Sequence, residues 1–196
     1  MKTIYTLCCA LALLTLKAKA QTEDYVITTQ GDTLKCNISF PIVGPSKYKI
    51  PGGESQKLDR DKIKEYYITR KDLRKRAVFM GDKTKADFLE VVENGNISLY
   101  KIIYTNGRTS TEEWYIGKAS DRVSALKSSS LFLGKRRKDR KDDFSEMLKD
   151  KPEVYDKYMA EKKFSFNAIQ NLVHLYNTGH SLKEDTPVIT KKDDAY

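Results

Sequence analysis

Outside the first twenty residues, cysteine and histidine occur only at Cys36, His174 and His180. Cys36 stands on the apolar side of an alternating strand pattern, where a cysteine acts as a small hydrophobic residue. The two histidines are six residues apart and so cannot share a helix face, and Gly179 breaks the helix between them. There is no Gly-x-Ser-x-Gly elbow and no Cys/His pair with metal-ligand spacing. We therefore expect a protein that has no set of catalytic residues and binds no metal or cofactor. The alternative is a hydrolase whose catalytic residues are far apart in the sequence and come together only in the folded chain.

The densest charged segment of the chain is basic. It consists of Lys135, Arg136, Arg137, Lys138, Arg140 and Lys141. Such a segment can hold a polyanion, anionic lipid or the phosphates of lipopolysaccharide. Phe132 and Phe144 flank the run but do not interrupt it, which argues against base stacking on nucleic acid. The alternative is a solvated basic linker over residues 119–138.

The chain is rich in aromatic side chains, with twelve tyrosines and one tryptophan. Most of them stand at strand or helix positions that predict a place in the core. The alternative interpretation is an exposed aromatic platform for a carbohydrate or a peptide.

Residues 1–20 have the three parts of a cleavable export signal. Lys2 provides the positive start, Ile4 to Leu16 form an apolar run, and Ala18 to Ala20 form a small-x-small end. The run is shorter than the roughly 20 apolar residues of a membrane-spanning helix, and no second long apolar segment follows. A lipid anchor at Cys8 or Cys9 is the alternative, but neither residue follows a small one. A signal retained as an anchor is also open. We expect an exported protein in the periplasm, at the outer membrane or in the medium.

Removal of this signal leaves 176 of the 196 residues. The signal holds three lysines and no acidic residue, so the net charge falls from +9 to +6, which favours solubility and weak attraction to polyanions. Cys36 is the one cysteine that stays, and it cannot form an internal disulfide. The fold must therefore rest on its hydrophobic core, in one domain or one domain with an extension.

Residues 21–118 predict an antiparallel β domain. Alternation and turn residues indicate strands over Asp24–Thr29, Thr33–Phe40, Arg76–Met80, Phe88–Glu93, Asn96–Tyr104 and Thr111–Gly117, with at most a short strand at Lys47–Ile50 and a connector from Lys57 that runs into a strand. Asn94-Gly95 predicts a type I′ turn. The strand after it carries apolar residues on both faces, so we expect it to be central and covered on both sides.

Residues 139–178 predict a helical extension. Apolar spacing indicates helices over Asp143–Lys149, Pro152–Lys162 and Ser165–Asn177. Asp143 and Ser165 are the expected N-caps, and Gly179 is the expected stop. The polar tail over residues 179–196 is expected to be disordered.

Three segments together resemble a known group of proteins. They are Gly31-Asp32-Thr33-Leu34-Lys35, the strand segment Glu93 to Tyr100, and the end from Asp150-Lys151-Pro152-Glu153 to Tyr176-Asn177. They are similar to uncharacterised secreted proteins of the Bacteroidota, which open with a signal peptide and a Gly-Asp-Thr-(Ile/Leu)-Lys hairpin and end in short helices. This chain departs from them at Cys36, where relatives often have Gly, and at Lys151, where they often have Cys. The resemblance implies an envelope or secreted location and no particular activity.

The sequence thus predicts an α+β fold, an antiparallel sheet (a meander or small open barrel) followed by a bundle of short helices. The first functional hypothesis is a non-catalytic exported envelope protein that binds a protein or a surface component such as a glycan. The second is a polyanion- or anionic-lipid-binding module that uses residues 135–141. We expect no nucleic acid partner, because an exported protein rarely meets one.

The first prediction concerns processing. Protein recovered after export should begin at Gln21, because the small-x-small end at Ala18 to Ala20 places cleavage there. N-terminal sequencing and intact mass measure this directly. A lipid-modified cysteine at the N-terminus would contradict it.

Overall fold

The computed structural model describes residues 23–129, 136–160 and 164–182. The predicted signal, Lys135 and the tail beyond Leu182 lie outside these residues. The strands are β1 (Asp24–Thr28), β2 (Thr33–Ser39), β3 (Lys47–Lys49), β4 (Ser55–Lys57), β5 (Ile63–Ile68), β6 (Leu73–Met80), β7 (Asp87–Glu93), β8 (Ile97–Asn106), β9 (Thr109–Lys118) and β10 (Arg122–Ser128). The helices are the 3₁₀ turn η1 (Thr69–Lys71), α2 (Arg137–Leu148), α3 (Pro152–Ala160) and α4 (Phe166–Thr178).

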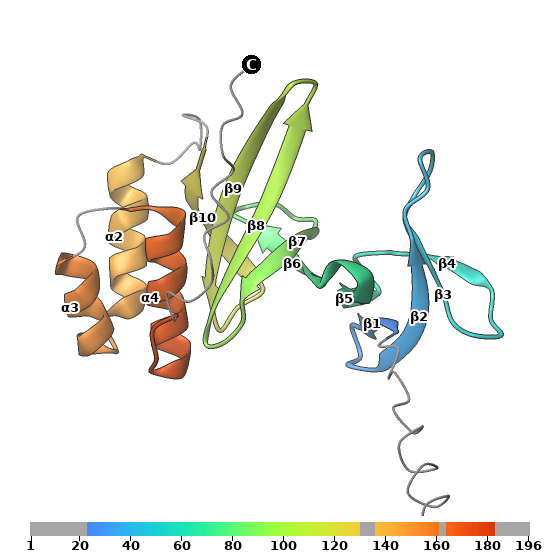
Figure 1. The fold of residues 1–196 in the computed structure, drawn as a ribbon, viewed down its shortest axis with the longest axis horizontal. Helices are drawn as coiled ribbons and strands as arrows, with labels where there is room; N and C mark the ends of the chain where they lie inside the picture. Colours follow the sequence, from blue (N-terminus) through green and yellow to red (C-terminus); the bar gives the residue numbers. More distant parts are fainter. Residues whose placement is uncertain (1–22, 130–135, 161–163, 183–196) are drawn as a thin grey trace, which may run out of the picture.

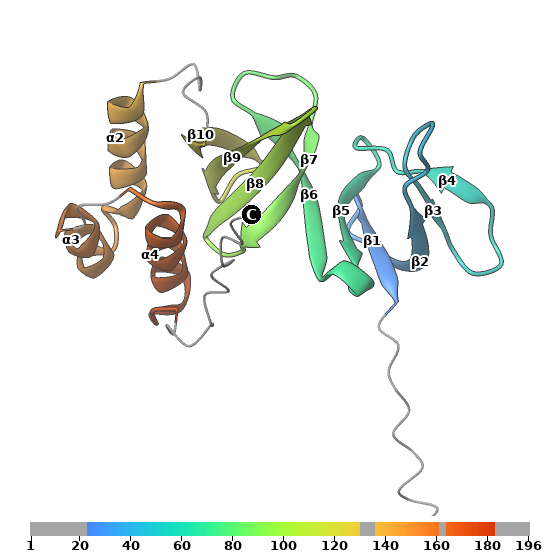
Figure 2. The ribbon, with the colours of Figure 1, turned by 45° about the horizontal axis from the view of Figure 1, so that its top comes forward.

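The fold is α+β, as predicted: one large, mainly antiparallel sheet precedes three helices (Figure 1). The strand order is β10-β9-β8-β7-β6-β5-β1-β2-β3-β4, so strands from β5 to β10 pair with their neighbours in sequence, and β1 lies between β5 and β2. A short parallel pairing joins β10 to β6 through Arg122–Phe79 and Val123–Met80. Figure 2 shows the helices at one end of the sheet and β1 to β4 at the other.

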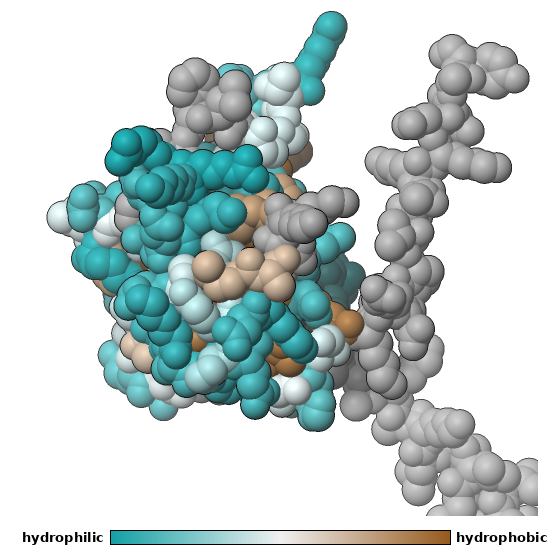
Figure 3. Space-filling view, turned by 90° about the vertical axis from the view of Figure 1, so that its left-hand side faces the viewer, coloured by the Kyte–Doolittle hydropathy of each residue, from teal (hydrophilic) through white to brown (hydrophobic). Residues whose placement is uncertain are grey.

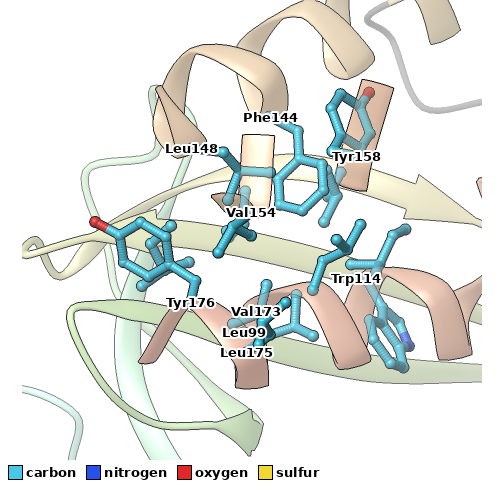
Figure 4. Close-up of a cluster of buried hydrophobic side chains, with 14 of the residues drawn as sticks. Leu99, Trp114, Phe144, Leu148, Val154, Tyr158, Val173, Leu175 and Tyr176 are labelled. Atoms are coloured by element: carbon cyan, nitrogen blue, oxygen red, sulfur yellow. The ribbon is translucent and has the colours of Figure 1, made fainter. Parts of the chain in front are cut away.

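The core has three parts. The largest lies between the helices and strands β8 to β10, where Figure 4 shows Phe144, Tyr158 and Val173 meeting Leu99 and Trp114. The second lies among β1, β2, β3 and β5, and the third covers the opposite face of β6 to β10. No helix of the described residues is long and apolar enough to cross a membrane.

Strand β8 is covered on both faces only over its first half. Residues from Ile97 to Tyr100 are buried, whereas Ile103 and Tyr104 are 55% and 43% exposed. The reason lies in the pairing, because β7 follows β8 only as far as Lys101. The outer half of the β8–β9 hairpin therefore projects beyond its neighbours (Figure 1), and the prediction of a fully covered strand was wrong for this half.

The segment predicted as a linker, residues 119–138, contains strand β10 and the first residues of α2. Helix α2 begins at Arg137, six residues before the predicted cap Asp143. Its first turns are polar, so the apolar period that begins at Phe144 could not reveal them, although arginine and lysine are good helix formers. The predicted cap Ser165 does accept from the backbone N–H of Ala168 at 3.1 Å, and Gly179 ends α4 in the left-handed region.

The prediction of a type I′ turn at Asn94-Gly95 was also wrong, because neither residue has a positive φ. Gly95 is needed there for space. A Cβ atom at this position would overlap the side-chain amide of Asn177 in α4. That amide accepts from the backbone N–H of Ile97 at 3.1 Å and donates to the carbonyl oxygen of Ile97 at 2.7 Å. Asn177 thus joins α4 to the start of β8.

Tyr176 makes the second polar link between helices and sheet. Its hydroxyl accepts from the Asn96 amide at 3.1 Å and donates to the Asp150 carboxylate at 2.7 Å. Lys118 of β9 forms a 2.8 Å ion pair with the same carboxylate. The ring of Tyr176 is buried. Hydrogen bonds require defined distances and angles, so these bonds fix the orientation of the helix on the sheet, which non-directional apolar packing alone would not do.

The second prediction tests this docking. Gly95→Ala should lower the free energy of unfolding by about 1–3 kcal/mol, because the added methyl group overpacks the Asn177 contact. Asn177→Ala introduced into the Gly95→Ala protein should restore part of that loss, which a double-mutant cycle in urea measures.

Gly53→Ala is the matched control. Gly53 also lacks a positive φ, and a Cβ atom there approaches its neighbours no closer than 3.4 Å. We expect a change within about 1 kcal/mol. Equal effects of the two substitutions would show that Asn177 does not define the space at Gly95.

Candidate functional site

Cys36 and the two histidines, the residues whose types could do chemistry, lie on different elements of the fold. Cys36 of β2 is 6% exposed, and its burial raises the thiol pKa to about 11. His174 lies on α4, where its Nδ1 atom is 3.2 Å from the Glu93 carboxylate of β7. His180 follows the end of α4 and is exposed. In the described residues no group of three or more His, Cys, Asp or Glu side chains could hold a metal ion.

One carboxylate is buried among the described residues, that of Glu65 in β5. Two guanidinium groups of β6 hold it: the Nη2 atom of Arg76 at 2.6 Å and the Nε atom of Arg74 at 3.4 Å. Both arginines come from the neighbouring strand, in which Arg76 pairs directly with Glu65. This cluster of one carboxylate and two guanidinium groups carries a net charge of +1 and ties two strands together.

Within the described residues, the members of the basic run lie on α2 or at its N-cap and make different contacts. Arg136 pairs with Asp139 at 3.2 Å, and the Nε atom of Arg140 donates to the carbonyl oxygen of Leu126 at 3.0 Å. Arg137, Lys138 and Lys141 line an open groove between α2 and α3 with Tyr155, Tyr158 and Met159. Figure 3 shows that this helical side of the molecule is largely hydrophilic.

Lys127 of β10 belongs to the same cationic region, and sequence reasoning missed it. Its Nζ atom lies 4.9 Å from the ring centroid of Phe166 and 5.9 Å from that of Phe164. The Nζ atom of Lys141 lies 5.8 Å from the Phe164 centroid on the α2 side. Burial and the nearby charges of Arg137 and Arg140 lower the pKa of Lys127. In the sequence, Lys127 is a single lysine within the predicted linker over residues 119–138, and nothing in the local pattern indicates that it lies near α2.

We name these four residues, Lys127, Arg137, Arg140 and Lys141, the cationic cluster. They come from a strand and a helix, and the two lysines among them place their Nζ atoms over the rings of Phe164 and Phe166. Asp142 is the acidic side chain that lines the adjoining groove. Cations held this close repel one another, and a bound anion would relieve that repulsion. The arrangement can therefore bind phosphate, sulfate or carboxylate groups.

Six of the ten tyrosines in the described residues are buried in the core, as predicted, but two of the others form an aromatic pair at a groove. The rings of Tyr25 and Tyr67 stack with centroids 5.4 Å apart. The groove beside them is also lined by Arg74, Glu90 and Lys101. Lys101 and Glu90 are themselves paired at 2.8 Å. The groove offers aromatic and hydrogen-bonding surface together, the combination that suits a glycan or a peptide.

Comparison with models of protein families, with curated proteins and with solved structures finds no match for this chain. The candidate site therefore rests on the geometry of the chain itself.

The third prediction concerns the chemistry of Cys36. At pH 8 its alkylation by iodoacetamide should be more than about 100-fold slower than that of free cysteine, because a pKa of about 11 leaves little thiolate. The rate should rise as pH increases towards 11. Peptide mass spectrometry of the Cys36 peptide measures it, and the same protein in urea is the control. Rapid labelling of the folded protein would contradict the burial of Cys36.

Proposed function

We propose that this protein is a non-catalytic exported protein of the cell envelope that binds an anionic component of the envelope surface through the cationic cluster. The export-signal pattern of residues 1–20 supports the location. The resemblance to secreted proteins of the Bacteroidota points in the same direction. Nucleic acid is not the proposed partner, because an exported protein rarely meets it.

One observation carries the proposal: Lys127 and Lys141, from β10 and α2, approach the same Phe164 ring from two elements, with Arg137 and Arg140 beside them. A solvated linker would leave these cations separate, whereas here they are held together. The phenylalanine rings restrict the lysine stems, so less conformational entropy is lost when an anion binds.

A second candidate is a protein or glycan partner at the Tyr25–Tyr67 groove. The stacked pair supports it, since aromatic side chains offer large contact area with few rotatable bonds. Its polar neighbours Lys101 and Glu90 already pair with each other, so a ligand there must compete with that ion pair. At Lys127 the neighbouring charges of Arg137 and Arg140 lower the pKa, so a bound anion would there relieve repulsion between cations.

The fourth prediction tests the proposed function with inorganic polyphosphate as the probe. The exported protein should bind it, and affinity should fall by more than about tenfold between about 50 and 200 mM salt, because binding releases counterions. Arg137→Gln with Lys141→Gln should weaken binding at low salt by about tenfold or more and flatten the salt dependence. Fluorescence anisotropy of labelled polyphosphate measures both.

The matched control is Lys64→Gln with Arg70→Gln, which removes the same charge from exposed positions of β5 and η1. If this variant loses as much affinity as the cluster variant, attraction depends on net charge alone and the cationic cluster is not a site. Binding that does not respond to salt would also contradict the proposal.

A further inference from the structure

The loop between β2 and β3 holds the two most exposed large apolar side chains of the described residues. Ile42 is fully exposed and Val43 is 88% exposed, and Phe40 beside them is 43% exposed. Soluble proteins seldom leave neighbouring large apolar side chains in water unless a partner covers them. The predicted strand Thr33–Phe40 ends one residue early, because β2 ends at Ser39, and the Phe40 ring packs only partly, 6.3 Å from the ring centroid of Tyr66.

The shape of this loop is restrained by its own sequence. Pro41 and Pro45 enclose Ile42, Val43 and Gly44, and each proline fixes its own φ. Gly44 has a φ of +100°, which other residues rarely adopt. The apolar tip is therefore largely ordered before it meets a partner, which reduces the entropy lost on binding.

Three lysines lie at the two ends of this loop, where it leaves β2 and enters β3. Lys47, the first residue of β3, lies directly opposite Lys57 in the register with β4. Lys71 of η1 places its Nζ atom 5.9 Å from the ring centroid of Phe40. No aspartate or glutamate occurs between Asp32 and Glu54. Like charges in opposite register repel each other, so an anionic surface would stabilise this end of the loop.

We propose that the β2–β3 loop inserts Ile42 and Val43 into the surface of a bilayer that contains anionic phospholipid. The aliphatic tip matches the boundary between headgroups and acyl chains, and Lys47, Lys57 and Lys71 match the negative headgroups. An apolar pocket in a protein would suit the tip alone but not the three lysines around it. The inference goes beyond the cationic cluster and does not rest on it.

The arrangement of the whole molecule supports a flat partner. In Figures 1 and 2 the β2–β3 loop, the turn of the β8–β9 hairpin and the start of α2 all lie at the upper end. The hairpin brings exposed Ile103 and Tyr104 towards that end. A bilayer can contact several separate projections at once, which a single pocket cannot.

The test is the fifth prediction and uses vesicles of phosphatidylcholine with phosphatidylglycerol, compared with phosphatidylcholine alone. The exported protein should co-sediment with the mixed vesicles. Ile42→Ser with Val43→Ser should lower the partition coefficient by about tenfold or more, because the apolar contact is lost without a change in charge. Both side chains are exposed, so the melting temperature of the variant should stay the same.

Leu182→Ser is the control, because it removes an apolar side chain that is 37% exposed and does not line the groove beside the cationic cluster. Its partition coefficient should equal that of the unaltered protein. Equal partition of the loop variant and the unaltered protein would overturn the inference, as would a failure to bind the mixed vesicles.

A second readout follows the loop itself. An indole introduced by Ile42→Trp should shift its emission to the blue and be quenched by brominated acyl chains, whereas Trp114 is buried and should not respond. Unquenched emission from position 42 on bound vesicles would overturn insertion.

The two proposals fail separately. The variant Arg137→Gln with Lys141→Gln should lose polyphosphate binding and keep the quenching at position 42. Quenching without polyphosphate binding would leave the loop inference standing and remove the proposed function. Polyphosphate binding without quenching at position 42 would leave the proposed function standing and overturn the loop inference.

Discussion

The contact between the Asn177 side chain and the backbone of Ile97 is the constraint on which the arrangement of helices and sheet depends. Apolar packing between α4 and β8 is strong but non-directional, so it would tolerate sliding of the helix along the strand. The amide of Asn177 meets both the N–H and the carbonyl of one residue, as a neighbouring strand would. The position of α4 along β8 is thereby defined, and Gly95 leaves the space that this requires.

The position of α4 in turn determines where the cationic cluster forms. Phe166 opens α4 and Phe164 precedes it, and both rings lie against Lys127 of β10. Helix α2 is held from the other side, because Arg140 donates to the Leu126 carbonyl and the Tyr158 hydroxyl of α3 donates to the Lys141 carbonyl. The cations of α2 and of β10 meet because two helices are docked on the same sheet.

The two proposed contacts of this protein depend on different physical forces. The cationic cluster acts through charge, which salt screens over about 10 Å at moderate ionic strength. The β2–β3 loop acts mainly through apolar surface at Ile42 and Val43, which salt does not screen. The two features lie at opposite ends of the sheet order, near β10 and β2. A surface that offers both negative charge and an apolar layer would engage both of them.

The sequence by itself determined the α+β class, most strand positions and the capped helix α4, because these follow from local periodicity and from residues such as Ser165 and Gly179 that act on their own neighbours. It also showed that residues 135–141 are basic, but not which cations meet. The tertiary structure alone decided that Lys127 lies near Arg137, that Gly95 allows a close approach of Asn177 and that the apolar residue Phe40 stays 43% exposed. Each of these depends on pairs far apart in the chain, and a local pattern carries no information about such pairs.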